Sequence, residues 1–137
     1  MGSQARHAAP ALFRGVRPPE KLYNPSTLVR LSVMYPAAPG TTFDWNYYIG
    51  PHLAMAHRLL VPMGLIRIEL DRGVMAFPPG TPSHFHAVGH LFFDGMEELQ
   101  RALATHAPAL VADQRRYFSG ESIVQVSEVL ELNSPGR

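Results

Sequence analysis

Three side chains with acid–base chemistry recur at intervals of four residues. They are Asp44, Tyr48 and His52, and residues four apart lie on the same side of a continuous helix. A tyrosine can donate a hydrogen bond to a carbonyl or enolate, and a histidine can take or return a proton near neutral pH. We therefore hypothesise that these three are catalytic, with His52 as the acid–base group and Tyr48 as the hydrogen-bond donor.

Each of the three residues also has a purely structural interpretation. Asp44 can act only as a helix N-cap and Tyr48 only as a packing residue of an amphipathic helix. His52 can bond to a backbone carbonyl that is left free because Pro51 has no N–H group. The spacing alone leaves both interpretations open.

Further polar and aromatic residues are candidates for substrate binding. Arg30 and Arg67 can hold a carboxylate or a phenolate, or can pair with acidic residues such as Glu69. His84 and His86 have a spacing that can ligate zinc, but no carboxylate partner is apparent, so no metal site is predicted. The complete set of predicted substrate-binding residues is Arg30, Arg67, His86, His90, Phe92, His106 and Gln125.

The periodicity of apolar residues predicts the elements that position these side chains. Alternation predicts strands over Thr27 to Pro36, Leu65 to Arg72, His84 to Phe93 and Ser122 to Glu131. Helical spacing predicts one helix from Asp44 to a stop at Gly64, and a second that begins with a capping box at Asp94 and Glu97. The order βαββαβ predicts an α+β, ferredoxin-like fold with an antiparallel four-stranded sheet.

Two helices can cover only one face of such a sheet. In the predicted register the strands place Ile66 on the covered face. The other face would then expose Leu28, Met34, Leu65, Val88, Phe92, Ile123 and Val129. Because soluble monomers rarely expose so large an apolar patch, the pattern predicts a homodimer in which a second sheet covers this face. The polar residues on the same face predict a partly polar cavity there.

Length and composition limit the domain organisation and the class of partner. The chain has 137 residues, a net charge of +1 and no cysteine. We predict a flexible N-terminal arm over 1–26, one domain over 27–132 and a tail over 133–137. The arm has only weak features of an organelle transit peptide, so a cytoplasmic protein is expected. A slightly acidic body and the lack of a long apolar run indicate no nucleic-acid partner and no membrane partner.

Several motifs together resemble those of the EthD family, which is named for ethyl tert-butyl ether degradation. The resemblance covers about residues 28–130. Its first motif is Tyr35-Pro36-x-x-Pro39-Gly40-x-x-Phe43-Asp44-x-x-Tyr47-Tyr48-x-x-x-His52. The others are Leu59-Leu60-x-Pro62-x-Gly64-Leu65, Asp71-Arg72-Gly73, Gly89-His90-Leu91-x-Phe93-Asp94, His106, Asp113 and Gln125-Val126-Ser127-Glu128-Val129. Residues 114–119 read Gln-Arg-Arg-Tyr-Phe-Ser where the family often has an Ile-Pro-Asn-Tyr-Thr-Asp-like segment.

The resemblance implies a dimeric α/β barrel, whose members are often called EthD family reductases. In ether degradation such proteins accompany an oxygenase system, and wider relatives include cofactor-independent monooxygenases, isomerases, cyclases and haem-binding proteins. The chain itself has no Rossmann glycine pattern, P-loop or Ser-His-Asp elbow, so its sequence gives no support to a nicotinamide-dependent reductase.

Taken together, the sequence predicts a cofactor-independent enzyme of isomerase, cyclase, dehydratase or monooxygenase-accessory type. Its substrate would be a hydrophobic organic molecule of a catabolic, xenobiotic-degrading or secondary-metabolic pathway. Two alternatives remain open. One is a non-catalytic ligand-binding or carrier dimer that assists an oxygenase, and the other is a haem-binding barrel with a histidine as axial ligand.

Overall fold

A computed structural model describes residues 23–24 and 27–132 of the chain. The predicted order of elements is confirmed. In chain order the elements of the main body are β2 (Val29–Pro36), α2 (Trp45–Tyr47), the π-helical turn η3 (Tyr48–His52), α3 (Leu53–Leu60), the 3₁₀ turn η4 (Val61–Met63), β3 (Leu65–Arg72), β4 (Phe85–Phe93), α4 (Met96–Asp113), the 3₁₀ turn η5 (Gln114–Arg116) and β5 (Ile123–Glu128).

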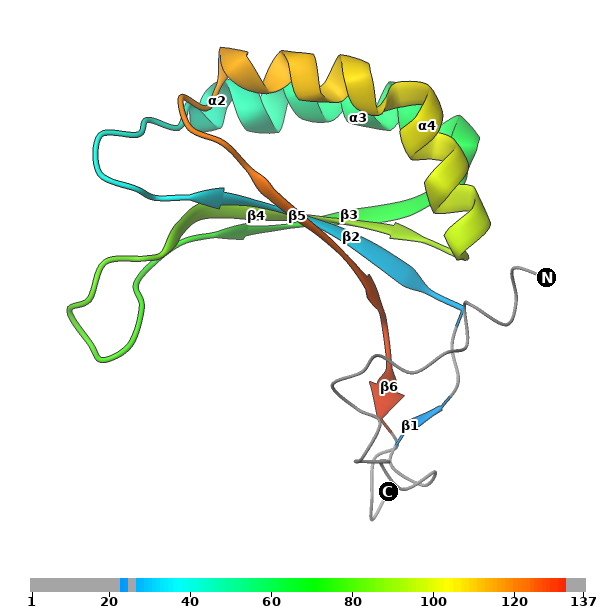
Figure 1. Ribbon diagram of the computed structural model, residues 1–137, viewed down its shortest axis with the longest axis horizontal. Helices are drawn as coiled ribbons and strands as arrows, with labels where there is room; N and C mark the ends of the chain where they lie inside the picture. Colours follow the sequence, from blue (N-terminus) through cyan, green and yellow to red (C-terminus); the bar gives the residue numbers. More distant parts are fainter. Residues whose placement is uncertain (1–22, 25–26, 133–137) are drawn as a thin grey trace.

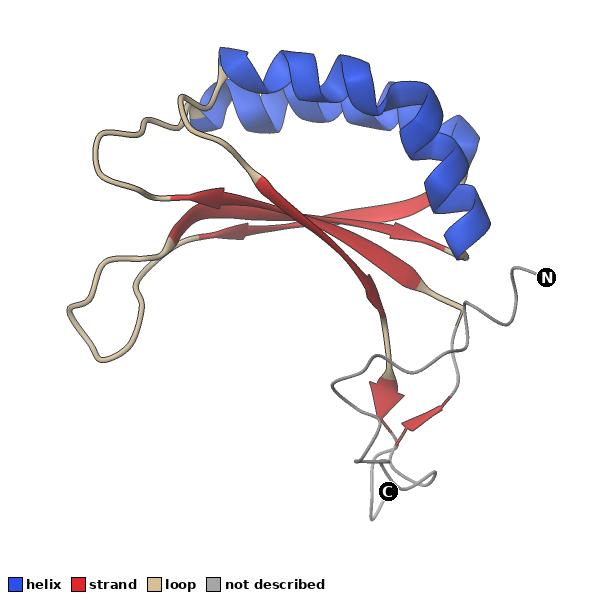
Figure 2. Cartoon of the chain, viewed as in Figure 1, coloured by secondary structure: helices blue, strands red, loops and turns tan. Residues whose placement is uncertain are grey.

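The four long strands form one antiparallel sheet with the order β3-β4-β2-β5. The helices all lie on one face of this sheet, and no described element covers the other face (Figures 1 and 2). This is the α+β, ferredoxin-like arrangement that the sequence predicts. The two central strands, β2 and β4, therefore carry most of the buried residues of the sheet.

A second, two-stranded sheet lies beyond the end of the main sheet (Figure 1). It pairs β1 (Tyr23–Asn24) with β6 (Glu131–Leu132). The predicted final strand, Ser122 to Glu131, is therefore divided into β5 and β6 by residues 129 and 130. Of the expected N-terminal arm, residues 23–24 form β1, whereas 1–22, 25–26 and the tail 133–137 lie outside the described residues.

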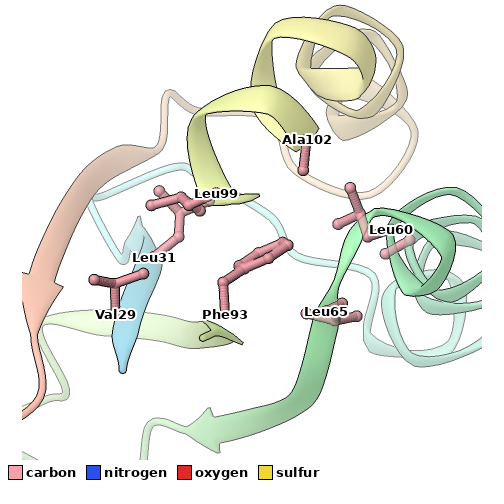
Figure 3. Packing of buried hydrophobic residues seen from close by; sticks show 8 residues of the cluster. Val29, Leu31, Leu60, Leu65, Phe93, Leu99 and Ala102 are labelled. Atoms are coloured by element: carbon pink, nitrogen blue, oxygen red, sulfur yellow. The ribbon is translucent and has the colours of Figure 1, made fainter. Parts of the chain in front are cut away.

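The main core lies between the sheet and the two helices (Figure 3). Leu60 of α3, Leu99 of α4 and Phe93 of β4 are fully buried and meet there. Burying side chains of this size contributes about 1.5–3 kcal/mol each. This core fixes the helices against the sheet at the end where β4 leads into α4.

One strand departs from the predicted alternation at its first residues. Leu65 was expected on the uncovered face and Ile66 on the covered face, but Leu65 is buried in the core and Ile66 is 49% exposed. A β-bulge causes the difference, because Leu65 pairs with Phe93 while Arg67 already pairs with Phe92. From Arg67 onward the strand returns to the predicted faces.

The helix ends agree only in part with the predicted signals. Gly64 ends the first helical run with a φ of +106°, a left-handed conformation that glycine adopts without steric cost, as predicted. The capping box at Asp94 is wrong, because α4 begins at Met96 after Gly95 and no side chain caps it. Asp94 instead accepts a hydrogen bond from the hydroxyl of Thr27. No helix among the described residues has the length and apolar character needed to cross a membrane.

Candidate functional site

A cavity of about 200 Å³ lies between the helix-covered face of the sheet and the helices α3 and α4. Its walls are almost wholly aliphatic, with contributions from the central strands and both helices. The polar or aromatic residues that line it are Tyr35, Tyr48, His52, Gln114 and Ser122. Val111 and Val124, which also line the cavity, are more than half exposed, so it opens between α4 and β5.

The helical run that carries Tyr48 and His52 is not a regular α-helix. Asp44 caps α2 by accepting a hydrogen bond from the Tyr47 amide at 3.1 Å. This is the N-cap role of its structural interpretation. A π-helical turn follows and contains Pro51, whose missing N–H cannot bond within the helix. π-turns inside helices are rare and are frequent at functional sites. Here the turn brings the rings of Tyr48 and His52 into a stack.

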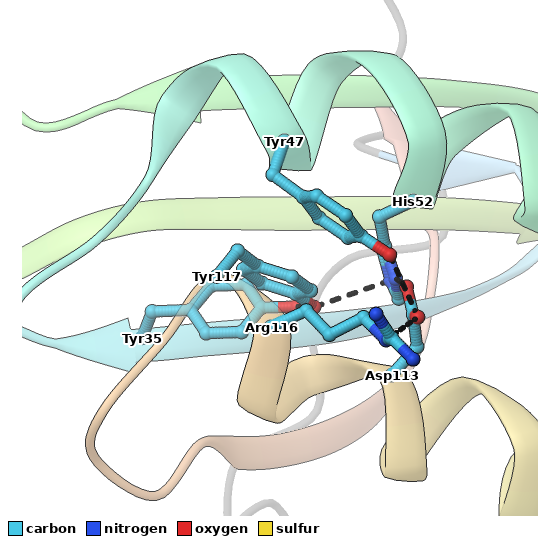
Figure 4. A network of polar contacts seen from close by, with 6 residues as sticks. All are labelled: Tyr35, Tyr47, His52, Asp113, Arg116 and Tyr117. Carbon is cyan, nitrogen blue, oxygen red and sulfur yellow. Dashed lines mark hydrogen bonds and ion pairs between the residues drawn. The ribbon is translucent and has the colours of Figure 1, made fainter.

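His52 belongs to a network of polar side chains drawn from distant parts of the sequence (Figure 4). Its Nδ1 lies 2.9 Å from Oδ2 of Asp113, at the end of α4, and both side chains are nearly buried. The hydroxyl of Tyr47 donates to Oδ1 of the same carboxylate at 2.9 Å, and Arg116 Nε lies 3.5 Å from that oxygen. His52 thus bonds to side chains and not to a backbone carbonyl.

The other ring nitrogen of His52 also has a partner. Its Nε2 lies 3.1 Å from the hydroxyl of Tyr117, which in turn lies 2.7 Å from the hydroxyl of Tyr35 (Figure 4). Because the Asp113 carboxylate only accepts, the His52 Nδ1 carries a proton and donates it. In the neutral ring Nε2 must then accept from Tyr117, whose oxygen accepts from Tyr35. The geometry therefore assigns one direction to the whole chain of hydrogen bonds.

The environment separates the acid–base properties of these groups. Burial, together with neighbouring oxygens, raises the pKa of Tyr35, Tyr48 and Tyr117 well above the ordinary value, so all three phenols stay protonated. Burial opposes ionisation of Asp113, but the hydrogen bonds from His52 and Tyr47 outweigh it and lower the net pKa. The site therefore combines a fixed carboxylate with uncharged hydroxyl donors around one imidazole.

An aromatic cluster holds the network in place. Tyr35, Tyr48 and Tyr117 pack on one another with Phe43 and Phe118, and the ring centroids in contact are 5.0–6.0 Å apart. Beneath them Gly89 leaves room for the Tyr48 hydroxyl, because a Cβ at Gly89 would lie 2.6 Å from that oxygen.

Most of the predicted substrate-binding residues lie on the uncovered face of the sheet and not in the cavity. His90 bonds through Nδ1 to Ser32 and through Nε2 to Asp71, each at 2.9 Å. Arg67 pairs with Glu69 and covers the ring of Phe92, which is buried, while Gln125 bonds to Ser127. Arg30 Nε is the one buried side-chain nitrogen or oxygen among the described residues that has no hydrogen-bond partner.

The two remaining predicted residues also lie apart from the cavity wall. His86 bonds to Thr41 at 2.9 Å and stacks on Phe43. His106 is partly buried on α4, one residue before the cavity-lining Ala107. No group of three or more potential metal ligands gathers within the described part of the chain.

Sequence reasoning did not identify Asp113, Tyr117, Tyr35 and Tyr47 as site residues. Asp113 and Tyr117 lie more than 60 residues from His52, so helical spacing carries no information about them. Asp113 was among the motif residues of the EthD resemblance, and Tyr117 lies in the segment that departs from the family pattern. Tyr117 itself agrees with the tyrosine of the family segment, so the resemblance was the only sequence signal for Asp113 and Tyr117.

Comparisons with known proteins place the fold among EthD-like proteins. No protein-family model and no curated protein matches the chain. An EthD-like protein from Ralstonia eutropha JMP134 has 25% sequence identity and a TM-score of 0.69 over 75% of this chain and 92% of that one. An EthD family protein from Bacillus halodurans C-125 has 20% identity and a TM-score of 0.59 over 74% and 98%.

A more distant similarity extends to an oxygenase. A mutant of SnoaB, a cofactor-independent oxygenase from Streptomyces nogalater, has 12% identity and a TM-score of 0.53 over 76% of this chain and 94% of that one. The two structures below 25% identity share the fold alone. The resemblance to EthD proteins that the sequence motifs predict is confirmed.

Proposed function

We propose that this EthD-like protein is a cofactor-independent enzyme that moves a proton on an uncharged, mainly hydrophobic small molecule bound between the helices and the sheet. The observation that carries the proposal is a polarised histidine at the wall of an apolar cavity. His52 serves as the acid–base group and Tyr48 as the hydrogen-bond donor to a carbonyl or enolate oxygen. We assign no catalytic role to Asp44, because its carboxylate caps α2 and the residue does not line the cavity.

The composition of the cavity wall supports an uncharged substrate. The wall contains no Lys, Arg, Asp or Glu among the described residues, so a charged group would lose its hydration without gaining a partner. At about 200 Å³ the cavity is smaller than the roughly 300–1,000 Å³ that is usual for drug-sized ligands. A compact ring system with one or two oxygen atoms matches both properties.

The network around His52 supports acid–base chemistry. Asp113 fixes the Nδ1–H tautomer and stabilises the imidazolium that forms when Nε2 gains a proton. Protonated phenols near the same end of the cavity can stabilise a developing enolate. Positioned general acid–base groups of this kind accelerate proton transfer by about 10²–10⁴-fold.

The site does not fit a haem. An axial histidine needs a free ring nitrogen, whereas Nδ1 and Nε2 of His52 are held by Asp113 and Tyr117. The remaining wall of the cavity offers only Gln114, Ser122 and tyrosines as polar groups.

The proposal is tested by exchange of the α-protons of 2-tetralone, a neutral bicyclic ketone, in D₂O followed by NMR. We expect the wild-type protein to accelerate exchange, and His52→Ala to reduce the enzymatic rate by about 10²–10⁴-fold. Tyr48→Phe should lower the rate less and leave probe binding nearly unchanged. His57→Ala is the matched control, because His57 is an exposed histidine on α3 outside the cavity wall.

Equal exchange in the wild-type and His52→Ala proteins would overturn the proposal. The alternative function, a carrier that holds a product for an oxygenase, is favoured by one observation, namely that both ring nitrogens of His52 are engaged within the protein. A carrier would bind 2-tetralone without accelerating its exchange. Titration by tryptophan fluorescence of Trp45, the single tryptophan, measures that binding.

We also propose that the protein acts as a homodimer through the uncovered face of the sheet. The unpartnered Nε of Arg30 and the exposed Ile123 lie on this face. The face is more polar than the sequence indicated, because Leu65 belongs to the core and Arg67 covers Phe92. A second copy would exclude water from the His90 and Ser32 pair.

A further inference from the structure

The hydrogen bonds that leave His52 lead back to the cavity. Tyr117 accepts from Tyr35 at 2.7 Å and donates to His52 Nε2 at 3.1 Å, and Tyr35 itself lines the cavity whereas Tyr117 does not. Tyr35 is only 2% exposed and Tyr117 only 3%, so bulk water does not compete for these bonds. The path from the cavity to the Asp113 carboxylate is therefore continuous and made only of side chains.

We infer that the chain Tyr35–Tyr117–His52–Asp113 is a proton relay, in which Tyr35 is the catalytic residue that meets the substrate and Tyr117 and Asp113 are positioning residues. The inference rests on the proposed function and deepens it, because it names which atom touches the substrate. It also specifies the substrate class as a neutral molecule with an acidic proton, either a C–H next to a carbonyl or an enolic or phenolic O–H.

The relay moves one proton by coupled bond exchanges. The substrate C–H or O–H bond breaks as the proton bonds to Tyr35 Oη, and its electron pair stays on the substrate as an enolate or phenolate. The original Tyr35 proton passes to Tyr117 Oη, and the Tyr117 proton passes to His52 Nε2. Each tyrosine remains neutral throughout, and Asp113 stabilises the resulting imidazolium. The reverse sequence returns a proton to a different atom of the substrate.

Burial favours this coupled route over free tyrosinates. The raised pKa of Tyr35 and of Tyr117 makes a discrete phenolate costly, whereas simultaneous transfer never creates one. Direct attack by His52 would instead require Tyr117 to give up its bond to Nε2. The two routes thus make opposite predictions for the removal of the Tyr117 hydroxyl.

The first test is 2-tetralone α-proton exchange in Tyr117→Phe and Tyr35→Phe, which are isosteric changes. The relay predicts that each variant loses about 10²–10⁴-fold in rate while its affinity for 2-tetralone stays within about threefold. Direct catalysis by His52 instead predicts that Tyr117→Phe exchanges 2-tetralone at an unchanged or higher rate, because Nε2 is then free. That result would overturn the relay and leave the proposed function standing.

The second test needs no substrate. In ¹⁵N-labelled protein the His52 Nε2 signal reports on the strength of the hydrogen bond that it accepts. Because the hydrogen bonds from the Tyr35 hydroxyl reach His52 Nε2 through Tyr117, the relay predicts that Tyr35→Phe changes the Nε2 chemical shift, as Tyr117→Phe does to a larger extent. An Nε2 signal that does not respond to Tyr35→Phe would overturn the relay. Lack of 2-tetralone exchange in the wild-type protein, with a responsive Nε2, would instead refute the proposed function.

Discussion

At the scale of single residues, the His52 and Asp113 pair makes stability depend on pH. Asp113 has a lowered pKa in the folded protein, so the pair contributes fully above the ordinary aspartate pKa of about 4 and is lost as pH falls through the lowered value. Asp113→Asn keeps one acceptor oxygen but replaces the other with an NH2 donor, so either the His52 Nδ1–H or the Tyr47 hydroxyl loses its acceptor. We expect it to reduce the free energy of unfolding at pH 7 by about 1–3 kcal/mol.

Urea unfolding of both proteins between pH 7 and pH 2 measures this effect. The difference between wild type and Asp113→Asn should shrink as pH falls below about 4, because the carboxylate becomes protonated in both folded and unfolded chains. Asp44→Asn is the matched control, since asparagine caps helices as well as aspartate does. A difference that stays constant over the whole pH range would contradict the pairing.

At the scale of elements, strand β4 and the helical run must approach closely for the site to form. Gly89 faces Tyr48, and an added Cβ would lie 2.6 Å from the tyrosine oxygen. We expect Gly89→Ala to destabilise the protein by about 1–3 kcal/mol, as overpacking does. Thermal unfolding measures the change, and Gly50→Ala is the control, because its Cβ meets nothing within 4 Å.

A double substitution identifies the cause of that loss. Tyr48→Phe removes the oxygen that the new Cβ would strike, so Gly89→Ala should cost clearly less in the Tyr48→Phe background. Equal costs in the two backgrounds would mean that the glycine serves the backbone of β4 and not the position of Tyr48.

The elements were more predictable than the site. Alternation and helical spacing predict every long strand and both helices, because burial of one face imposes a period on the sequence. The bulge at Ile66 was missed, because Ile66 is itself apolar and continues the alternation of Ile68 and Leu70, which hides the change of phase. Spacing singled out His52, but its partners come from α4 and from the turn after it, which only the packing of layers brings together.

At the scale of the whole molecule, the cavity and the uncovered face lie on opposite sides of one sheet. The sequence predicted most of the substrate-binding residues on the uncovered face, where several charged and aromatic residues alternate with apolar ones. The enclosed volume forms on the other side, where small residues such as Ala56 and Ala107 line the space between helices and sheet. A chain can therefore use one face of its sheet for chemistry and keep the other for assembly.

The final prediction concerns that assembly. If two sheets pack face to face, the native mass should be twice the 15.2 kDa of the chain. Val88 of β4, which pairs with Met34 of β2 and Asp71 of β3, should then be buried by the partner. Val88→Glu would then place a charge in the interface and yield monomers in light scattering coupled to size exclusion. Ala54→Glu is the matched control, because Ala54 is exposed on α3 on the other side of the sheet. A wild-type monomer, or a dimer that tolerates Val88→Glu as well as Ala54→Glu, would exclude this face as the interface.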